Sequence, residues 1–455
     1  MATNVLWFRR DLRLADHPAM VAAAGEGDQV LPLFVVDPRL QRTSGAPRLA
    51  FLARCLADLD DATGGRLVVR RGVPATVVAR VAKEVEAAGV YVSADFGPYG
   101  AARDDAVAKA LGDIPFERVG TPYAVDPGEV RTSGGGGFKV FTPFYRAWEA
   151  HGWGMPLDRP APTWATGVRT DGLPHAPTVA ASLPPAGEAA AHERFAEFLG
   201  DIARYRAERD RPDLDATSRL SPYLKYGCVH PRQLLARLGR SAGEEKFRTE
   251  LAWREFYADV LWHHPRSARR SLQPALRTIE VDTGAAADRR FEAWSQGRTG
   301  FPYIDAGMRH LLAEAWMPNR LRMAVASFLV KDLHLDWGRG ARWFMQHLVD
   351  GDLASNQHGW QWVAGTGTDP APYFRIFNPV TQGKEHDPDG NYVRRWVPEL
   401  AAIAGPAVHE PWTRTGQAAL FDPGPTPYPD RIVDHAEERQ EALARYQAAR
   451  RATPA

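Results

Sequence analysis

Two patterns of hydrophobic residues alternate along the first 130 residues. Short apolar, β-branched runs, each bounded by Gly, Asp or Pro, occupy residues 4–8, 29–36, 67–70 and 90–93. Between them, apolar residues recur three and four positions apart at 48–61 and 75–88, which is the spacing of amphipathic helices. This alternation predicts an α/β fold with a doubly wound parallel sheet, in which ligands gather beyond the carboxyl ends of the strands.

From about residue 188 the apolar spacing is that of helices throughout. The helical stretches lie at 191–209, 231–238, 244–263, 303–314, 319–335, 340–348 and 435–451. Residues 156–187 are rich in Pro, Ala, Thr and Gly without periodicity, which is typical of a linker. We therefore predict an α/β domain at residues 1–130, an interdomain linker at 131–190 and an all-helical domain at 191–455.

The composition narrows the class of protein. Hydrophobic residues at 44% and charged residues at 24% are typical of globular chains. The net charge of +1 gives no global attraction to nucleic acid, although a local basic face is compatible with it. Two cysteines, Cys55 and Cys228, make neither a disulfide framework nor a CxxC pair. The first residues carry charges where a signal peptide would be apolar, and no apolar run is long enough to span a membrane. We therefore expect a soluble, cytoplasmic protein, and we expect it to be a monomer.

Common ligand-binding fingerprints are missing from the chain. Neither GxGxxG nor GxxxxGKS occurs in the predicted α/β part, and the glycine run 134–137 has the character of a connector. His263 and His264 are adjacent, so one helix cannot direct both to the same ion, and no HExxH occurs. We predict no metal site.

Uncommon strings make the sequence specific. They are WFRRDLRLADHP (7–18), TSRLSPYLKYG (217–227), ELAWREFY (250–257), GRTGFPYIDAGMR (297–309), NRLRMAVASFLVKDLHLDW (319–337), DGDLASNQHGWQW (350–362) and YFRIFNPVTQGKEHD (373–387). In this order they closely resemble the photolyase/cryptochrome family, from residue 4 to about residue 400. The resemblance implies a flavoprotein in which an all-helical domain encloses FAD.

The resemblance places FAD along several of these strings. Hydroxyls just before a helix start suit a pyrophosphate, although Ser and Thr also cap helices without any ligand. Two carboxylates as close as Asp350 and Asp352 need a cationic or hydrogen-bonding partner. The FAD-binding residues that the resemblance implies are Tyr205, Thr217, Ser218, Arg219, Leu220, Ser221, Phe247, Glu250, Arg254, Asn319, Asp350, Gly351, Asp352 and Asn356.

The family's position beside flavin N5 is occupied by Asn356. An amide there resembles photolyases, whereas plant-type cryptochromes carry a carboxylate and insect ones a thiol. By resemblance Glu250 would hydrogen-bond the damaged bases and Trp253 would stack on them. Asn319 and Met323 match pocket residues of cyclobutane-dimer photolyases. The related 6-4 enzymes carry a histidine pair in this stretch, which this chain lacks. The expected catalytic residues are Glu250, Trp253, Asn319, Met323, Asn356 and Trp362.

DNA contacts are expected mainly from arginines, since phosphates dominate affinity. The resemblance implies Arg209, Trp253, Asn319, Arg320, Arg375 and Gln382 as DNA-binding residues. Solvated helix faces or internal ion pairs are expected instead for Arg322, Arg339, Arg342, Arg394 and Arg395.

Trp360 and Trp337 match the first two members of the family's tryptophan electron relay. The third position falls on Gly284, which cannot carry the electron vacancy, and Trp294 is then the candidate for the surface end.

A second chromophore, an antenna, is expected in the α/β domain. The loop after the fourth strand reads DFGPYGAAR (95–103), with Tyr99-Gly100 where folate-binding relatives have Asn-Glu. It resembles deazaflavin-binding members, so 8-hydroxy-5-deazaflavin is expected rather than methenyltetrahydrofolate, an empty site being the alternative. The antenna residues would be Val35, Val36, Asp37, Arg48, Leu49, Asp95, Tyr99 and Arg103.

These observations together predict light-dependent repair of cyclobutane pyrimidine dimers in DNA, by electron transfer from reduced FAD to a flipped-out dimer. The alternatives are a cryptochrome-type photoreceptor and a 6-4 photolyase. An ordinary flavin oxidoreductase is disfavoured because no NAD(P)-binding fingerprint is present.

Overall fold

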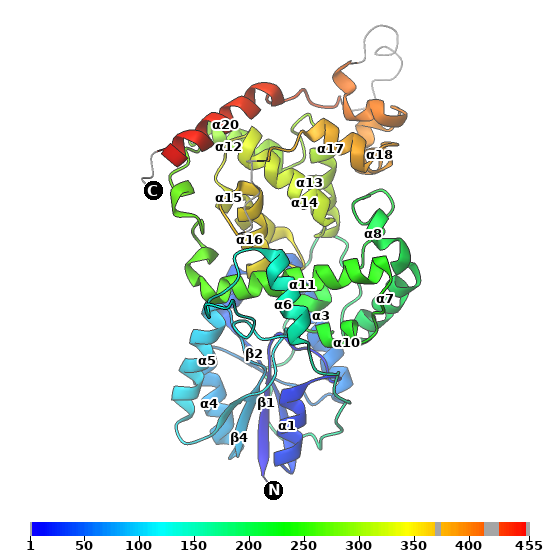
Figure 1. Ribbon diagram of the computed structural model, residues 1–455. Coiled ribbons are helices and arrows are strands. Elements are labelled where there is room, and N and C mark those ends of the chain that lie inside the picture. The colour runs from blue at the N-terminus through cyan, green and yellow to red at the C-terminus, as the bar shows by residue number, and fades with distance from the viewer. Residues whose placement is uncertain (1, 369–374, 414–426, 452–455) are drawn as a thin grey trace.

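The computed structural model describes residues 2–368, 375–413 and 427–451, which form an α/β domain and a helical domain (Figure 1). The strands are β1 (Thr3–Phe8), β2 (Gln29–Val36), β3 (Val68–Arg71), β4 (Gly89–Val92) and β5 (Phe116–Arg118). They form one parallel sheet in the order β3-β2-β1-β4-β5. The predicted α/β fold is therefore confirmed. The edge strand β5 was not predicted, because three residues with little burial carry no apolar run.

Helices cover both faces of the sheet. They are α1 (Pro18–Glu26), α2 (Pro38–Thr43), α3 (Ala46–Ala62), α4 (Pro74–Glu84) and α5 (Pro98–Leu111). Alternate residues of β1 point to opposite faces, so Leu6 and Phe8 belong to one buried cluster and Val5 and Trp7 to another. The first cluster continues into the helical domain, whereas the second is closed by α4 and α5. This double coverage explains why the central strands are apolar on both sides.

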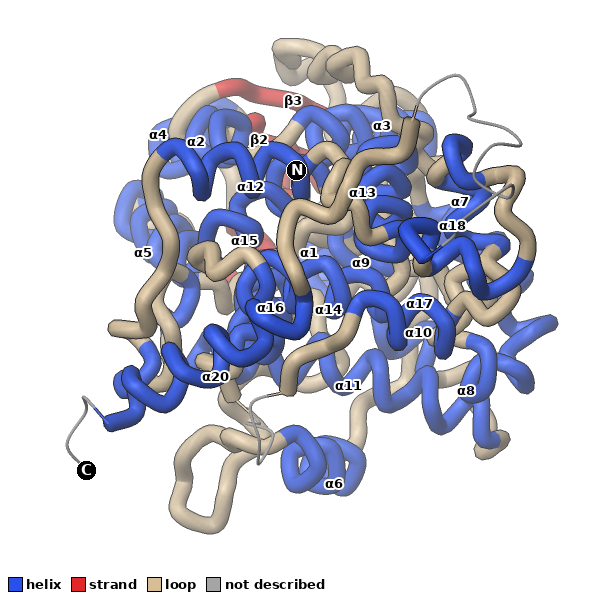
Figure 2. Tube along the Cα trace, turned by 90° about the horizontal axis from the view of Figure 1, so that it is seen from above, coloured by secondary structure: helices blue, strands red, loops and turns tan. Residues whose placement is uncertain are grey.

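The helical domain begins after a long connecting segment. Its α-helices are α7 (Glu188–Asp201), α8 (Tyr205–Glu208), α9 (Ser221–Tyr226), α10 (Pro231–Leu235), α11 (Ala242–His263), α12 (Ala285–Ser295), α13 (Pro302–Glu314), α14 (Asn319–Ser327), α15 (Trp337–His347), α16 (Leu353–Ala364), α17 (Pro379–His386), α18 (Asn391–Trp396) and α20 (His435–Arg451). Short 3-10 turns are η1 (Ile202–Arg204), η2 (Pro265–Ala268), η3 (Pro274–Leu276), η5 (Pro398–Leu400), η6 (Gly405–His409) and η7 (Pro411–Thr413). Seen from above, α14 and α16 lie near the centre of the molecule (Figure 2).

Two helices show how the sequence sets these boundaries. The start of α11 is fixed by a capping box, in which Ser241 and Glu244 each satisfy the other's backbone N–H. The stretch predicted as one helix at 319–335 is instead α14 followed by the π-helix η4 (Phe328–Asp332). A single π-turn alters the helical spacing over only five residues, too few for the apolar pattern to reveal the change.

The segment predicted as a linker contains an additional helix, α6 (Phe141–His151), which packs on α11 (Figure 1). Trp148 is fully buried there and donates to the buried carboxylate of Glu255, which also accepts from the backbone of Ala124 and Val125. Further along, the segment runs beside the sheet, where Ala165 donates to the Val30 carbonyl. This connection therefore fixes α11 to the α/β domain.

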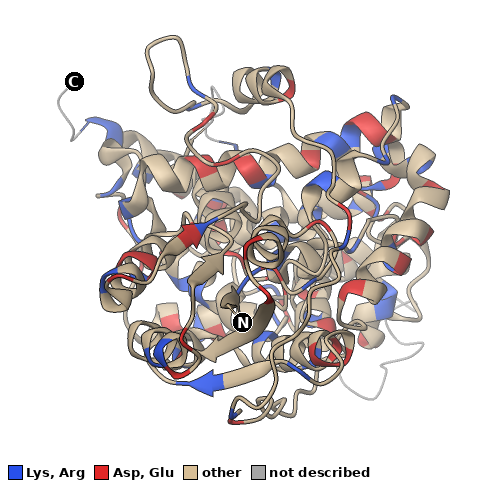
Figure 3. Cartoon of the chain, turned by 90° about the horizontal axis from the view of Figure 1, so that it is seen from below, with Lys and Arg blue, Asp and Glu red and all other residues tan. Residues whose placement is uncertain are grey.

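The two domains meet at the carboxyl edge of the sheet. Gly227, which ends α9 with φ +70, lies so close to the chain after β1 that an added Cβ would stand 2.0 Å from the Arg10 carbonyl oxygen. Only glycine tolerates both that contact and that backbone angle. Seen from below, basic and acidic residues are interspersed along the chain (Figure 3). No helix in the described ranges is long and apolar enough for a membrane span.

Candidate functional site

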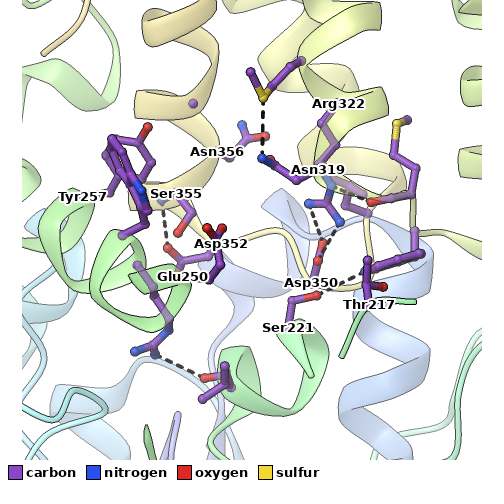
Figure 4. Close-up of a pocket in the computed structure, with 18 of the residues that line it drawn as sticks. Thr217, Ser221, Glu250, Tyr257, Asn319, Arg322, Asp350, Asp352, Ser355 and Asn356 are labelled. Atoms are coloured by element: carbon purple, nitrogen blue, oxygen red, sulfur yellow. Dashed lines mark hydrogen bonds and ion pairs between the residues drawn. The ribbon is translucent and has the colours of Figure 1, made fainter. Parts of the chain in front are cut away.

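A cavity of about 470 Å³ lies in the helical domain between α11, α14 and α16 (Figure 4). The residues expected from sequence that line it are Tyr205, Arg209, Thr217, Ser218, Arg219, Ser221, Phe247, Glu250, Trp253, Arg254, Asn319, Met323, Asp350, Gly351, Asp352, Asn356, Trp360 and Trp362. Its size is within the usual range of cofactor pockets. The expected flavin-binding and catalytic residues thus come together, from segments far apart in sequence.

One wall is the turn that precedes α9. Arg219 has φ +51, which places it in the left-handed region and turns the chain sharply before the helix. Its guanidinium makes ion pairs of 2.8 Å with Asp215 and with Glu314. The Thr217 hydroxyl is buried without a hydrogen-bond partner among the described residues. Thr217 also lines the cavity, so this hydroxyl is open to a hydrogen bond from a ligand there.

The second wall is acidic, and each carboxylate has the cationic partner that the sequence argument required. Asp350 accepts two bonds from Arg322, of 2.7 and 3.2 Å (Figure 4). Asp352 caps α16 by accepting from the Ser355 backbone at 3.1 Å. Arg10, from the loop after β1, reaches Asp352 at 2.6 Å across the domain boundary.

The charges at this boundary perturb one another. Burial disfavours the ionised form of Asp352, but Arg10 and Lys225 outweigh it and hold the pKa of this carboxyl well below its usual range. Conversely, burial and the nearby Arg10 guanidinium lower the pKa of the Lys225 ammonium to about 7. Lys225 lines the cavity, so an anionic ligand there would favour its charged form.

α16 supplies the third wall. The Asn356 amide nitrogen donates to the Ala341 carbonyl at 3.1 Å and to the Gln357 side chain at 2.8 Å, which leaves Oδ1 as the accepting end of the amide. Trp360, one turn later, packs directly over Gly340 of α15, where an added Cβ would stand 2.1 Å from the indole. Glycine at 340 is what allows this indole to lie against α15 and also line the cavity.

Glu250 and Trp253 reach the cavity from α11, and both are held from behind. Arg209 makes a close ion pair with Glu250, and Lys246 lies 3.0 Å from the same carboxylate. Trp253 stacks on Phe141 of α6, with centroids 3.7 Å apart and planes at 6°. The second face of this half-buried indole is therefore the one available to a flat ligand.

Asn319 and Met323 lie one turn apart on α14. The Asn319 amide lies 3.6 Å from the Met323 sulfur (Figure 4).

Arg254, three residues before Tyr257 on α11, donates hydrogen bonds to the Pro122 and Leu224 carbonyls and so ties α11 to both domains.

Some expected residues do not line the cavity. Leu220 is buried behind it, and Trp337, 8% exposed, donates to the Ser271 hydroxyl. Arg320 is paired with Asp210 at 2.8 Å. Arg375 is exposed, whereas Gln382 is only 9% exposed, which is little for a residue expected to contact DNA.

Two further positions concern the electron relay. Gly284 is exposed and immediately precedes α12. Trp294, the candidate for the surface end, is fully buried and donates to the Val325 carbonyl. Trp294 is therefore not a surface residue, because α12 turns it into the core instead of toward solvent.

Four of the expected antenna residues make paired contacts next to the carboxyl ends of β2 and β4. The Tyr99 hydroxyl donates to Asp37, and burial together with this carboxylate raises the pKa of Tyr99 to about 12. Arg103 donates to Asp95 at 3.2 Å. Val35 and Val36 end β2, and Leu49 follows Arg48 on α3. Arg48 donates to the Met345 carbonyl in the helical domain, so this region borders both domains.

Several cavity residues were not identified from sequence. They include Lys225, Lys246, Tyr257, Trp316, Met317, Phe344, Leu348 and Ser355. Lys225 and Tyr257 lie inside quoted motif strings, so their positions were a usable signal. Phe141 was missed as well, although the apolar residues at 141, 144, 145 and 148 have the spacing of an amphipathic helix and were a usable signal.

The side chains that line the cavity fit FAD. Hydroxyls at 217, 218 and 221 together with the Arg219, Arg254 and Lys225 cations suit a diphosphate, and the aromatic and amide side chains of α11 and α16 suit an isoalloxazine ring. Within the described residues, no group of three His, Cys, Asp or Glu side chains is arranged to hold a metal ion.

Comparison with known proteins agrees with this geometry. The family model described as DNA photolyase matches residues 4–163, and that described as the FAD binding domain of DNA photolyase matches residues 247–448. The chain is 44% identical to the deoxyribodipyrimidine photo-lyase of Streptomyces griseus, over 99% of each chain. It superposes on a class III photolyase from Agrobacterium tumefaciens with a TM-score of 0.91 at 34% identity, covering 99% of this chain and 98% of that one.

A cryptochrome from Synechocystis sp. is also similar in structure, with a TM-score of 0.89 at 26% identity, covering 98% of this chain and 99% of that one. Full-length matches of this kind, together with a cavity built from the family's flavin-binding strings, place the chain in the photolyase/cryptochrome family.

Proposed function

We propose that this protein repairs cyclobutane pyrimidine dimers in DNA, using light and reduced FAD. The observation that carries the proposal is that Glu250, Trp253, Asn319, Met323 and Trp362 line the same cavity as the residues that fit FAD. A dimer flipped into this cavity would therefore lie against the cofactor. Photolyases are among the enzymes that take a base out of the stack to reach it.

FAD, when bound in its reduced form, supplies the electron that opens the cyclobutane ring. The chain would hold its diphosphate with the 217–221 turn and its ring system along 350–356. Because the Asn356 nitrogen is already bonded to Ala341, its free oxygen suits the N5–H of a reduced flavin. Asn356 would in this way favour the redox state that repair requires.

The substrate would be held by the residues on the other side of the cavity. Trp253, supported by Phe141, offers one face for stacking, and Trp362 offers a second aromatic surface. Arg209 and Lys246 neutralise Glu250 when no DNA is bound. Phosphates approaching these two cations would compete for them and release Glu250 to accept a hydrogen bond from a base.

The DNA strand would contact the arginines nearest the cavity. Arg209 lines the cavity and Arg320 follows Asn319 on α14, while Arg375 is exposed. We do not include Gln382, because so little of its side chain is exposed.

A 6-4 photolyase and a cryptochrome are the competing functions. The stretch with Asn319 and Met323 lacks the histidine pair that 6-4 enzymes carry there. Asn356 occupies the position at which plant-type cryptochromes have a carboxylate. Both positions favour dimer repair.

For the antenna we propose 8-hydroxy-5-deazaflavin. Tyr99, Asp37 and Arg103 provide hydroxyl, carboxylate and guanidinium groups at the carboxyl edge of the sheet, where ligands of parallel sheets bind. Absorption and mass spectra of the chromophores released from protein made in a deazaflavin-producing host would test this. Recovery of a folate instead would refute it.

The deciding experiment uses chemically reduced, FAD-loaded protein and an oligonucleotide that carries one thymine dimer. Light-dependent recovery of thymine absorbance is expected, with none in the dark. An otherwise identical oligonucleotide with a 6-4 photoproduct is the control. Recovery only with that control would establish a 6-4 enzyme, and recovery with neither would favour a photoreceptor.

A further inference from the structure

The electron route to the flavin ends abruptly at Trp337. The family's next position is Gly284, and among the described residues none of the aromatic ring contacts includes Trp337. Trp337 itself is buried, so it has little direct access to a donor in solution. An electron source outside the protein therefore needs another path.

A second series of aromatic rings starts at Trp360. Trp294 of α12 lies 6.2 Å from it, centroid to centroid, and Phe344 fills the angle between them at 4.9 Å from Trp360. From Trp294 the series continues to Phe291 at 5.5 Å and from Phe291 to Trp343 at 5.7 Å.

The inner rings of this series are buried and the outer ones are not. Trp360 lines the cavity and Trp294 is fully buried, whereas Phe291 and Trp343 are partly exposed. The series thus connects the flavin cavity with the surface formed by α12 and α15. Its rings come from three helices, α12, α15 and α16, so their spacing is fixed by rigid elements.

We propose that Trp343 is the surface end of an electron route to the flavin in this chain, with Trp294 as the relay between Trp343 and Trp360. The proposal rests on the flavin site described above. On illumination one electron would leave Trp360 for the flavin, and the vacancy would pass to Trp294 and then to Trp343. A thiol in solution would return one electron to Trp343, so that one electron moves from thiol to flavin.

The surroundings of the two new relay members tolerate a positive indole. The Trp294 N–H donates to the Val325 carbonyl at 2.9 Å, a bond that strengthens as the ring loses an electron. His347 stacks on Trp343 at 3.9 Å, and burial lowers the pKa of this imidazole, so the neutral form faces the indole. Arg339 lies 4.0 Å above Phe291, but Asp288 neutralises it at 2.8 Å.

Phe291 is the bridge between the two indoles. Phenylalanine is far harder to oxidise than tryptophan, so its ring would not hold the vacancy. The Phe291 ring lies between the two indoles and contacts both Trp294 and Trp343.

Photoreduction of bound FAD under blue light with excess thiol tests the route. Trp343→Phe should slow it by at least about tenfold, whereas Trp343→Tyr should restore part of the rate, because tyrosine can be oxidised and phenylalanine cannot. Trp262→Phe, at an exposed tryptophan of α11 outside the series, is the matched control. The yield of tryptophan radical after a laser flash is the second readout.

The outcomes separate a redox role from a structural one. An unchanged rate in Trp343→Phe overturns the proposal, and so does an equal loss in the Phe and Tyr variants, which would indicate damaged packing. FAD content and repair by chemically reduced protein should stay at the level of the unmodified chain. Failure of the unmodified chain to repair would instead refute the proposed function and leave the photoreduction result to stand.

Discussion

Removal of the Trp253 indole tests how the cavity holds a damaged base. This side chain is half-buried, with one face on Phe141 at 3.7 Å and its edge against Phe256 at 5.6 Å. Trp253→Ala would delete the face offered to the ligand and leave Phe141 without its stacking partner. FAD-binding groups on the 217–221 turn and at 350–356 would remain.

The expected size of the effect follows from these contacts. Stacking of a base on an aromatic ring contributes about 1–3 kcal/mol, so the dissociation constant for dimer-bearing DNA should rise roughly 5- to 150-fold. Truncation of a fully buried Trp costs about 3–5 kcal/mol of unfolding free energy. Trp253 is only half-buried, so the variant should lose less than this and remain folded.

The assay is fluorescence anisotropy with two labelled duplexes, one intact and one with a single thymine dimer, at fixed salt. Only binding to the damaged duplex should weaken, because the phosphate contacts are unchanged. Trp253→Phe should retain most of the affinity. Phe141→Leu, which removes only the support, should give an intermediate loss. Equal weakening for both duplexes, or loss of FAD from Trp253→Ala, would refute the stacking role.

Three further changes test other parts of the site. Asn356→Asp places a carboxylate beside the reduced flavin, so the fully reduced form should be harder to reach in a spectroscopic redox titration; an unchanged potential would exclude the contact. Gly340→Ala would push a methyl group into Trp360, so photoreduction should slow and thermal unfolding should show a loss of about 1–3 kcal/mol. Glu255→Ala would leave the Trp148 indole N–H and two backbone N–H groups buried without an acceptor, at about 1–3 kcal/mol each, which denaturant unfolding would detect as a lower midpoint.

The sequence by itself determined the order and type of most elements. β2 was predicted to the residue and α20 likewise, because strand and helix periodicities depend on neighbours only a few positions apart. The same local strings pointed to the flavin site. Every expected FAD residue except Leu220 lines one cavity, and Leu220 is a buried member of the 217–221 turn.

Tertiary structure alone decided which side chains support these residues. Phe141 comes from the span predicted as an interdomain linker, yet it stacks on one face of Trp253. Arg10 and Asp352 lie 342 positions apart in the sequence, and their ion pair exists only because the carboxyl edge of the sheet docks on the helical domain.

The same reason explains the aromatic series at Trp343. Trp294 could be named from its position after Gly284, but the sequence could not show that α12 buries it or that Phe291 and Trp343 continue the series outward. Periodicity tells which face of a helix is apolar. Which neighbour meets that face is set by how helices distant in sequence pack, because contact energies act through space and not along the chain.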